Sequence, residues 1–139
     1  MDENILDMHL LANNLSVHAK FWDRAEGKFR TGLFTFDTGA SVTTVSKDIL
    51  FNLGYDVETG NIEPITTASG LEYVREVFID KIRFGGFEFE NVLVYAHTFP
   101  EESLSTGVIG LNILSRFDIN MLFSKRQIVL TEIPDCDMG

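Results

Sequence analysis

Cysteine is almost missing from this sequence, and long apolar runs are missing altogether. The single cysteine, Cys136, cannot form a disulfide within the chain, so a reducing, cytoplasmic setting is the default expectation. No apolar run approaches the length that a membrane span needs. The acidic start, Met1-Asp2-Glu3-Asn4, also lacks the basic and apolar regions of a signal peptide, and we expect no association with a membrane.

Basic residues are scarce as well. The chain has 11 Lys and Arg against 21 Asp and Glu, a formal net charge of −10, whereas proteins that bind nucleic acids need clustered cations to contact phosphates. The three histidines, His9, His18 and His97, lie far apart without the spacing of metal ligands. No motif around Cys136 indicates a reactive thiol. We therefore predict no nucleic-acid partner, no metal and no cofactor.

The sequence is rich in apolar and aromatic residues. Hydrophobic residues make up 45% of its 139 positions, and 12 of them are phenylalanine. This composition is typical of a soluble globular protein with a phenylalanine-rich core, and the length predicts one domain over residues 1–139.

Short apolar stretches separated by turn residues predict an all-β fold. We expect about nine strands, in a barrel or sandwich, and two short helices. Extended stretches are predicted within residues 15–22, 29–37, 41–45, 62–67, 71–79, 79–84, 87–96, 107–110, 117–123 and 127–133. The helices are predicted at residues 47–53, with Ser46 as N-cap and Gly54 after the last turn, and at residues 111–116. Residues 1–14 fit either a helical turn or an extended arm.

A candidate catalytic group lies at the end of the strand predicted at residues 29–37. There the sequence reads Phe36-Asp37-Thr38-Gly39-Ala40-Ser41, after an apolar run at residues 32–36. Glycine permits a sharp turn and a close approach of the backbone to a ligand. A carboxylate between apolar walls and backbone N–H groups has the surroundings that turn a surface charge into a reagent. On this hexapeptide alone, an ordinary turn at a strand end fits equally well.

A second motif favours the catalytic interpretation. Residues 107–114 read Gly107-Val108-Ile109-Gly110-Leu111-Asn112-Ile113-Leu114, an apolar strand that ends in Gly110 and opens into a helical turn. Together the two motifs, and the order of elements over residues 15–133, resemble the retropepsin-like aspartic proteases. In that family one strand ends in Asp-Thr-Gly-Ala or Asp-Thr-Gly-Ser, and a second ends in two apolar residues and a glycine. The resemblance implies a closed β-barrel that assembles as a C2 homodimer.

The resemblance also implies roles for the residues of the first motif. Asp37 is expected to be the catalytic residue of an endopeptidase. Thr38 is expected to hydrogen-bond across the dimer, Gly39 to offer its N–H to the carboxylate and its carbonyl to the peptide, and Ala40 to leave room beneath the substrate.

Hydrolysis by aspartates needs two carboxyl groups that share one proton. The chain has one Asp-Thr-Gly. The similar triplet Glu58-Thr59-Gly60 is not a second catalytic candidate, because no apolar strand precedes it. We therefore expect the catalytic pair to consist of Asp37 from each of two copies across a two-fold axis.

The hairpin predicted at residues 62–79 has a small tip, Ala68-Ser69-Gly70. In the resembled family a hairpin at this place is the flap that folds over bound peptide, and the alternative is an ordinary surface hairpin. Thr106 and Val108 match family positions that line side-chain pockets, which favours bulky apolar side chains near the cut. An extended peptide would lie between the Asp37 loop and the flap. Residues 1–14 are a candidate for the terminal strands that join subunits in this family, or a frayed tail.

The sequence departs from the viral members of the family at two places. Viral members commonly have an acidic residue after the alanine and a paired arginine after the second-motif glycine, where this chain has Ser41 and Leu111. Both partners are replaced together, so no charge is left unpaired, and the chain is more similar to the cellular and bacterial single-domain branch. The alternative to an active endopeptidase is a catalytically silent relative that keeps the fold as a peptide-binding or dimerisation module.

Overall fold

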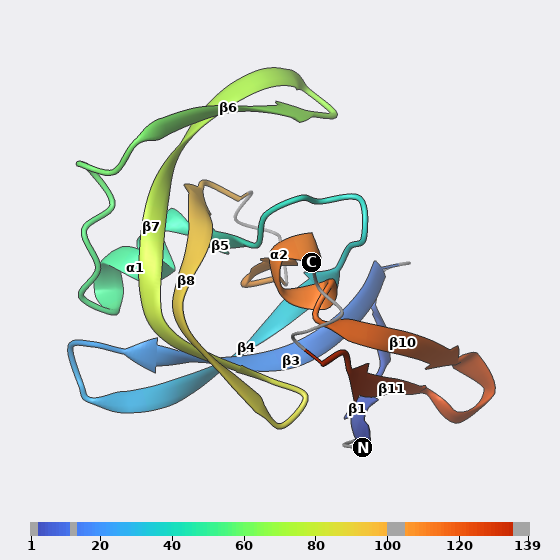
Figure 1. Cartoon of the computed structure of the whole chain (residues 1–139). Coiled ribbons are helices and arrows are strands. Elements are labelled where there is room, and N and C mark those ends of the chain that lie inside the picture. The colour runs from blue at the N-terminus through green and yellow to red at the C-terminus, as the bar shows by residue number, and fades with distance from the viewer. Residues whose placement is uncertain (1–2, 12–13, 100–104, 135–139) are drawn as a thin grey trace.

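The structure, a computed structural model, describes residues 3–11, 14–99 and 105–134. Strands dominate it, and two short helices and one 3-10 turn complete it (Figure 1). One sheet contains β2 (His9–Leu11), β3 (Asn14–Asp23), β4 (Lys28–Phe36), β5 (Thr44–Ser46), β6 (Ile62–Thr67), β7 (Gly70–Phe84), β8 (Phe87–His97) and β9 (Gly107–Ile109), and a smaller one contains β1 (Glu3–Asp7), β10 (Phe117–Leu122) and β11 (Gln127–Glu132). The helical elements are α1 (Lys47–Asn52), α2 (Leu111–Leu114) and the 3-10 turn η1 (Phe123–Lys125). The all-β prediction with two short helices is confirmed.

The larger sheet places the two sequence motifs on neighbouring strands. Its order is β2-β3-β4-β9-β5-β8-β7-β6, and an additional pairing joins β3 to β7, so that the strands from β3 round to β7 form a continuous circuit of pairings. β4 and β9 run parallel, with Thr35 opposite Val108 and Phe36 opposite Ile109. Because both strands run in the same direction, Asp37 and Gly110 leave the sheet at the same edge.

The first residues of the described chain are extended. β1 pairs antiparallel with β11, from Glu3 opposite Thr131 to Asp7 opposite Gln127. The helical alternative for residues 1–14 is therefore wrong over β1 and β2. Residues 1–2, 12–13 and Cys136 lie outside the described residues.

β7 is one strand of 15 residues, where the sequence predicted two strands that meet at residue 79. Its pairing with β8 keeps one register along the whole hairpin, yet the buried face changes at the level of Asp80 and Asn91. Next to this level, Val77, Ile79, Val92 and Val94 are buried on one side, and Ile82 and Phe84 on the other, with Phe87 and Phe89 partly buried. Asn91 has a φ of 51°, and this left-handed residue marks the level at which the buried face changes.

The buried side chains form a hydrophobic cluster rich in phenylalanine, as composition predicted. Five of the 12 phenylalanines are buried: Phe21, Phe34, Phe36, Phe84 and Phe117. The Phe117 ring contacts those of Phe84, Phe87 and Phe89 at centroid distances of 6.0, 5.1 and 6.0 Å. This contact attaches the smaller sheet to the β7–β8 hairpin.

The prediction for α1 is confirmed in position, and Ser46 and Gly54 flank the helix as expected. The helix begins after Ser46, whose side chain makes no capping hydrogen bond. Gly54 follows its end with a φ of +91°, the left-handed conformation that glycine tolerates best. No helix within the described ranges has the length and apolar character required to cross a bilayer.

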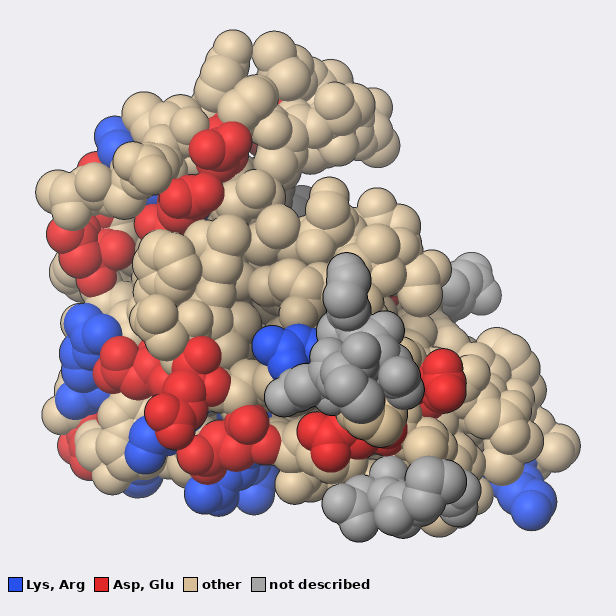
Figure 2. All heavy atoms as spheres, in the orientation of Figure 1, with Lys and Arg blue, Asp and Glu red and all other residues tan. Residues whose placement is uncertain are grey.

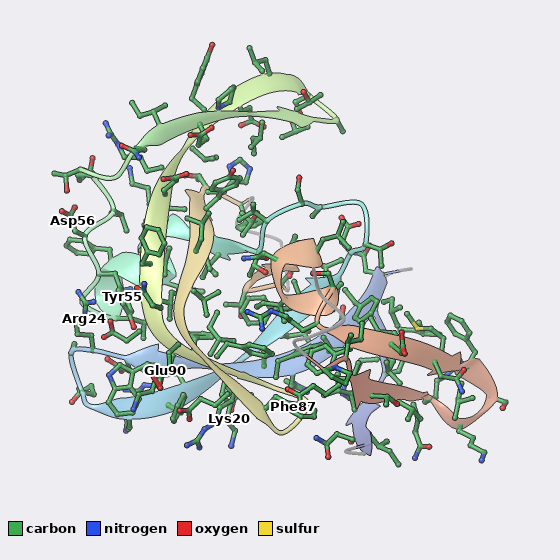
Figure 3. All side chains as sticks on the ribbon, in the orientation of Figure 1. Lys20, Arg24, Tyr55, Asp56, Phe87 and Glu90 are labelled. Atoms are coloured by element: carbon green, nitrogen blue, oxygen red, sulfur yellow. The ribbon has the colours of Figure 1, made fainter. Side chains whose placement is uncertain are left out.

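A polar cluster ties the β3–β4 turn to the chain that follows α1 (Figure 3). The Tyr55 hydroxyl donates to the Trp22 carbonyl at 2.8 Å and accepts from the Asp80 N–H at 3.2 Å. Arg24 lies 4.4 Å from the centre of the Tyr55 ring and donates to both carboxylate oxygens of Asp80, at 3.1 and 2.8 Å. Burial raises the pKa of Tyr55, so this hydroxyl keeps its proton and remains a donor.

Candidate active site

Asp37 is the first residue after β4, and the second motif holds it in place. Its backbone N–H donates to the carbonyl oxygen of Ile109 at 3.1 Å, which extends the pairing of β4 with β9 by one bond. Its carboxylate oxygen Oδ1 accepts the Gly39 N–H at 2.8 Å, as the resemblance implied for Gly39. These two hydrogen bonds hold the backbone and the carboxylate of Asp37 in place. The residue is half-buried, so the carboxylate remains accessible.

The loop after Asp37 lies on the start of α2. The Ala40 carbonyl accepts from the Leu111 N–H at 2.8 Å, and the Ser41 carbonyl accepts from the Asn112 N–H at 3.1 Å. Gly110 permits this contact, because a Cβ at that position would lie 2.8 Å from the Ala40 carbonyl oxygen. The helix therefore begins where its first free N–H groups meet the free carbonyls of the Asp37 loop.

Two residues that the sequence analysis did not single out brace this loop from below. Thr43 is fully buried, and both its N–H and its hydroxyl donate to the Asn112 side-chain oxygen at 2.8 Å. The Thr43 hydroxyl oxygen accepts the Gly110 N–H at 3.1 Å, and the Asn112 side-chain N–H donates to the Leu93 carbonyl at 2.8 Å. The sequence feature that could have identified Asn112 is its carboxamide, which lies inside the otherwise apolar turn at residues 111–114.

The β6–β7 hairpin arches over the Asp37 loop (Figure 1), and a hollow lies below its tip (Figure 2). Thr67 organises the tip: its hydroxyl oxygen accepts the Ser69 N–H at 3.2 Å and contacts the Gly70 carbonyl at 3.1 Å. Gly70 has a φ of +115°, and a Cβ there would meet nothing within 4 Å, so the backbone angle and not space requires glycine.

A cavity of about 410 Å³ lies between this hairpin and the end of β8. It is lined by Thr67, Ala68, Ser69, Glu72, His97, Thr98 and Phe99. The structure thus brings Ala68 and Ser69, two of the residues predicted to bind substrate, to the wall of one cavity, whereas Thr106 and Val108 are not part of its lining. The Thr106 side chain lies over Gly32, where an added Cβ would come within 2.7 Å of its Oγ1. Val108 is half-buried between its pairing partners Thr35 and Thr44.

The remaining residues of the first motif to be described are Thr38 and Ala40. Thr38 is exposed, and its hydroxyl makes no hydrogen bond within the described residues. Ala40 is half-buried, and its N–H donates to the Asp37 carbonyl at 3.3 Å. The Thr38 hydroxyl is therefore available to bond to another molecule.

The histidines are not all as isolated as their spacing suggested. The His9 and His18 rings meet edge to face at a centroid distance of 4.9 Å, because β2 and β3 are neighbours. In the part of the chain that the structure describes, no three side chains of the types that bind metals gather into a group.

Comparisons with known proteins identify a family and a fold. A family model described as "Aspartyl protease" matches residues 24–113, a range that contains both motifs. The crystal structure of a retropepsin-like aspartic protease from Rickettsia conorii matches with a TM-score of 0.66 at 21% sequence identity, over 93% of this chain and 89% of that one. No curated protein matches the chain. At that identity the structural match establishes a shared retropepsin-like fold.

Proposed function

Because this chain belongs to the aspartyl protease family, we propose that it is an aspartic endopeptidase that hydrolyses peptide bonds in peptide or protein substrates. The observation that carries the proposal is the position of Asp37. The residue lies at the end of a buried strand, its backbone is bonded to the second motif, and its carboxylate is oriented by the Gly39 N–H.

The proposed reaction needs two copies of Asp37. One carboxylate takes a proton from water while the water oxygen bonds to the carbonyl carbon, and the second, protonated carboxyl gives its proton to the carbonyl oxygen. The carbon–nitrogen bond of the resulting tetrahedral intermediate then breaks. The nitrogen leaves with a proton from one carboxyl of the pair, and a hydroxyl of the intermediate gives its proton to the other, so the pair again holds one proton. Each chain has one Asp-Thr-Gly, so the proposal includes a homodimer with the two Asp37 carboxyls face to face.

The other residues of the first motif have supporting roles in this proposal. Thr38 hydrogen-bonds to the partner copy, Gly39 offers its carbonyl to the substrate backbone, and Ala40 leaves space below the substrate. The peptide lies between the Asp37 loop and the hairpin tip at Ala68-Ser69-Gly70, near Thr106 and Val108. The scarcity of cysteine supports a cytoplasmic setting as part of the same proposal.

The smaller sheet offers a surface on which two copies can associate. Its order is β1-β11-β10, so among the described residues one edge of β1 and one edge of β10 have no strand partner. Edge strands present a row of N–H and C=O groups that another chain can pair with.

The test compares peptide cleavage by the wild-type protein with that by Asp37→Asn, together with sensitivity to pepstatin and the mass in sedimentation. We expect cleavage by a dimer, inhibition by pepstatin, and complete loss in Asp37→Asn with the fold unchanged. Asp48→Asn, which alters an exposed aspartate in the first turn of α1, is the matched control and is expected to retain activity. Peptide binding without cleavage by the wild-type protein would instead identify a silent peptide-binding module.

A further inference from the structure

The cavity below the hairpin tip has one carboxylate in its wall. Among its lining residues, Glu72 carries the acidic group, and the remainder are two threonines, an alanine, a serine, a histidine and a phenylalanine. A cavity whose wall combines one carboxylate with small, aromatic and imidazole side chains can favour one class of side chain.

Glu72 is held on the inner face of the hairpin. It lies opposite Ile65 in the β6–β7 register, on the same face as Thr67 and Val74. The Thr67 hydroxyl donates to Glu72 Oε2 at 2.8 Å, which fixes the carboxylate next to the tip. Glu72 is half-buried, so its charge is partly shielded from water but can still be reached from the cavity.

No ion pair among the described residues includes Glu72. Lys47 and Arg75 line an adjoining hollow of about 180 Å³ together with Glu72, but each is bonded to another group. The Lys47 ammonium lies 3.3 Å from a carboxylate oxygen of Glu58, and Arg75 donates to the Gly60 carbonyl at 2.8 Å.

The surroundings of the arch carry further negative charge. Burial raises the pKa of Tyr95 on β8, and the carboxylates of Glu63 and Glu76 raise it further. Figure 2 shows acidic side chains along the arch behind the tip. A cation that entered from solvent would therefore be attracted towards the cavity, where the Glu72 carboxylate can pair with it.

We propose that this cavity is a subsite for a basic side chain of the substrate, lysine or arginine, with Glu72 as the residue that selects it. The aliphatic part of such a side chain would lie against Ala68 and Phe99, and its charged end would bond to Glu72. This inference rests on the proposed endopeptidase function. It adds one subsite that prefers a cation to the apolar pockets expected at Thr106 and Val108.

The test is a cleavage profile. A mixture of peptides with varied sequences is digested, and the cut sites are identified by mass spectrometry. We expect lysine and arginine to be enriched at one position near the cut. Matched peptides with lysine or the uncharged norleucine at that position should then differ roughly tenfold in kcat/KM, the effect of one charge-assisted hydrogen bond.

Two substitutions identify the selecting residue. Glu72→Gln should abolish the preference for lysine over norleucine while norleucine peptides are still cut, and Glu72→Lys should reverse it in favour of acidic side chains. Glu63→Gln is the control, because Glu63 lies on the same face of the hairpin but does not line the cavity, and it should keep the preference.

The outcomes separate this inference from the function on which it rests. Cleavage by the wild-type protein without any basic preference, or an unchanged preference in Glu72→Gln, overturns the subsite and leaves the endopeptidase standing. Failure of the wild-type protein to cut any peptide, at the same level as Asp37→Asn, overturns the proposed function and the subsite together.

Discussion

Thr43 and Asn112, 69 positions apart in the sequence, are joined by two hydrogen bonds of 2.8 Å to the same carboxamide oxygen. The pair connects the loop after Asp37 to the first turn of α2. Through the Thr43 hydroxyl it also engages the Gly110 N–H, and through the Asn112 side-chain N–H it reaches Leu93 on β8. A buried network of this kind is stable only when every member is satisfied.

Substitution at Asn112 is therefore expected to damage both stability and activity. Asn112→Leu leaves the buried Thr43 N–H and hydroxyl without their acceptor, which should cost about 2–4 kcal/mol of unfolding free energy. Urea denaturation measures this loss, and peptide cleavage should fall because the Asp37 loop loses its brace. Thr43→Ser keeps the hydroxyl and is the control, with a smaller loss of stability than Thr43→Val. Equal losses in the two Thr43 variants would contradict the role of the hydrogen bonds.

Gly110 is expected to tolerate no side chain. Its φ of −109° is ordinary, so the constraint is space: an added Cβ would lie 2.8 Å from both the Ala40 carbonyl oxygen and the Val42 carbonyl carbon. Gly110→Ala should displace the Asp37 loop, destabilise the protein by about 1–3 kcal/mol and reduce kcat more than it changes KM. Leu111→Ala, at the next and exposed position, is the control for the same measurements. A crystal structure of Gly110→Ala with an unmoved loop would contradict this prediction.

Local patterns in the sequence were sufficient to predict most strands and the two motifs. Alternation and turn residues predicted the β3–β4 hairpin, and the apolar residues before Asp37 and Gly110 predicted two buried strands. The parallel pairing that brings these strands together depends on contacts between residues about 70 positions apart. Periodicity within a short window does not reveal such long-range contacts. The resemblance to a family therefore supplied the expectation that the two motifs belong to one site.

The features that the sequence did not predict correctly have a common physical cause. Residues 3–7 become a strand because β11 lies beside them, and their own pattern fits helix and strand alike. β7 was predicted as two strands that meet at residue 79, whereas its hydrogen-bond register with β8 continues past the level at which the buried face changes. Asn112 was missed because its partners, Thr43 and Leu93, are distant in the chain. In each case tertiary contacts decide the outcome.

The remaining prediction concerns stability in acid, because the polar cluster around Asp80 depends on carboxylates that protonation would neutralise. The Arg24 guanidinium, chiefly through its hydrogen bonds, lowers the pKa of Asp80, and Arg30 does the same for Asp23. The Thr59 hydroxyl lowers the pKa of Asp56. A carboxyl group whose pKa is lower in the folded chain adds stability above its unfolded pKa of about 3.9, and this stability disappears as pH falls through the folded value.

We therefore expect the unfolding free energy to fall as the pH is lowered from about 5 towards 3, and to fall less steeply in Asp80→Asn, which no longer has that carboxylate to protonate. At pH 6 the substitution should cost no more than about 1 kcal/mol, since the Arg24–Asp80 pair is 48% and 40% exposed and water screens it. Urea midpoints of the wild-type protein, Asp80→Asn and the exposed control Asp48→Asn, measured across this pH range, test the difference. A slope in Asp80→Asn as steep as that of the wild-type protein would show that the Arg24–Asp80 pair has no part in acid unfolding, and the decline would then belong to Asp23 and Asp56.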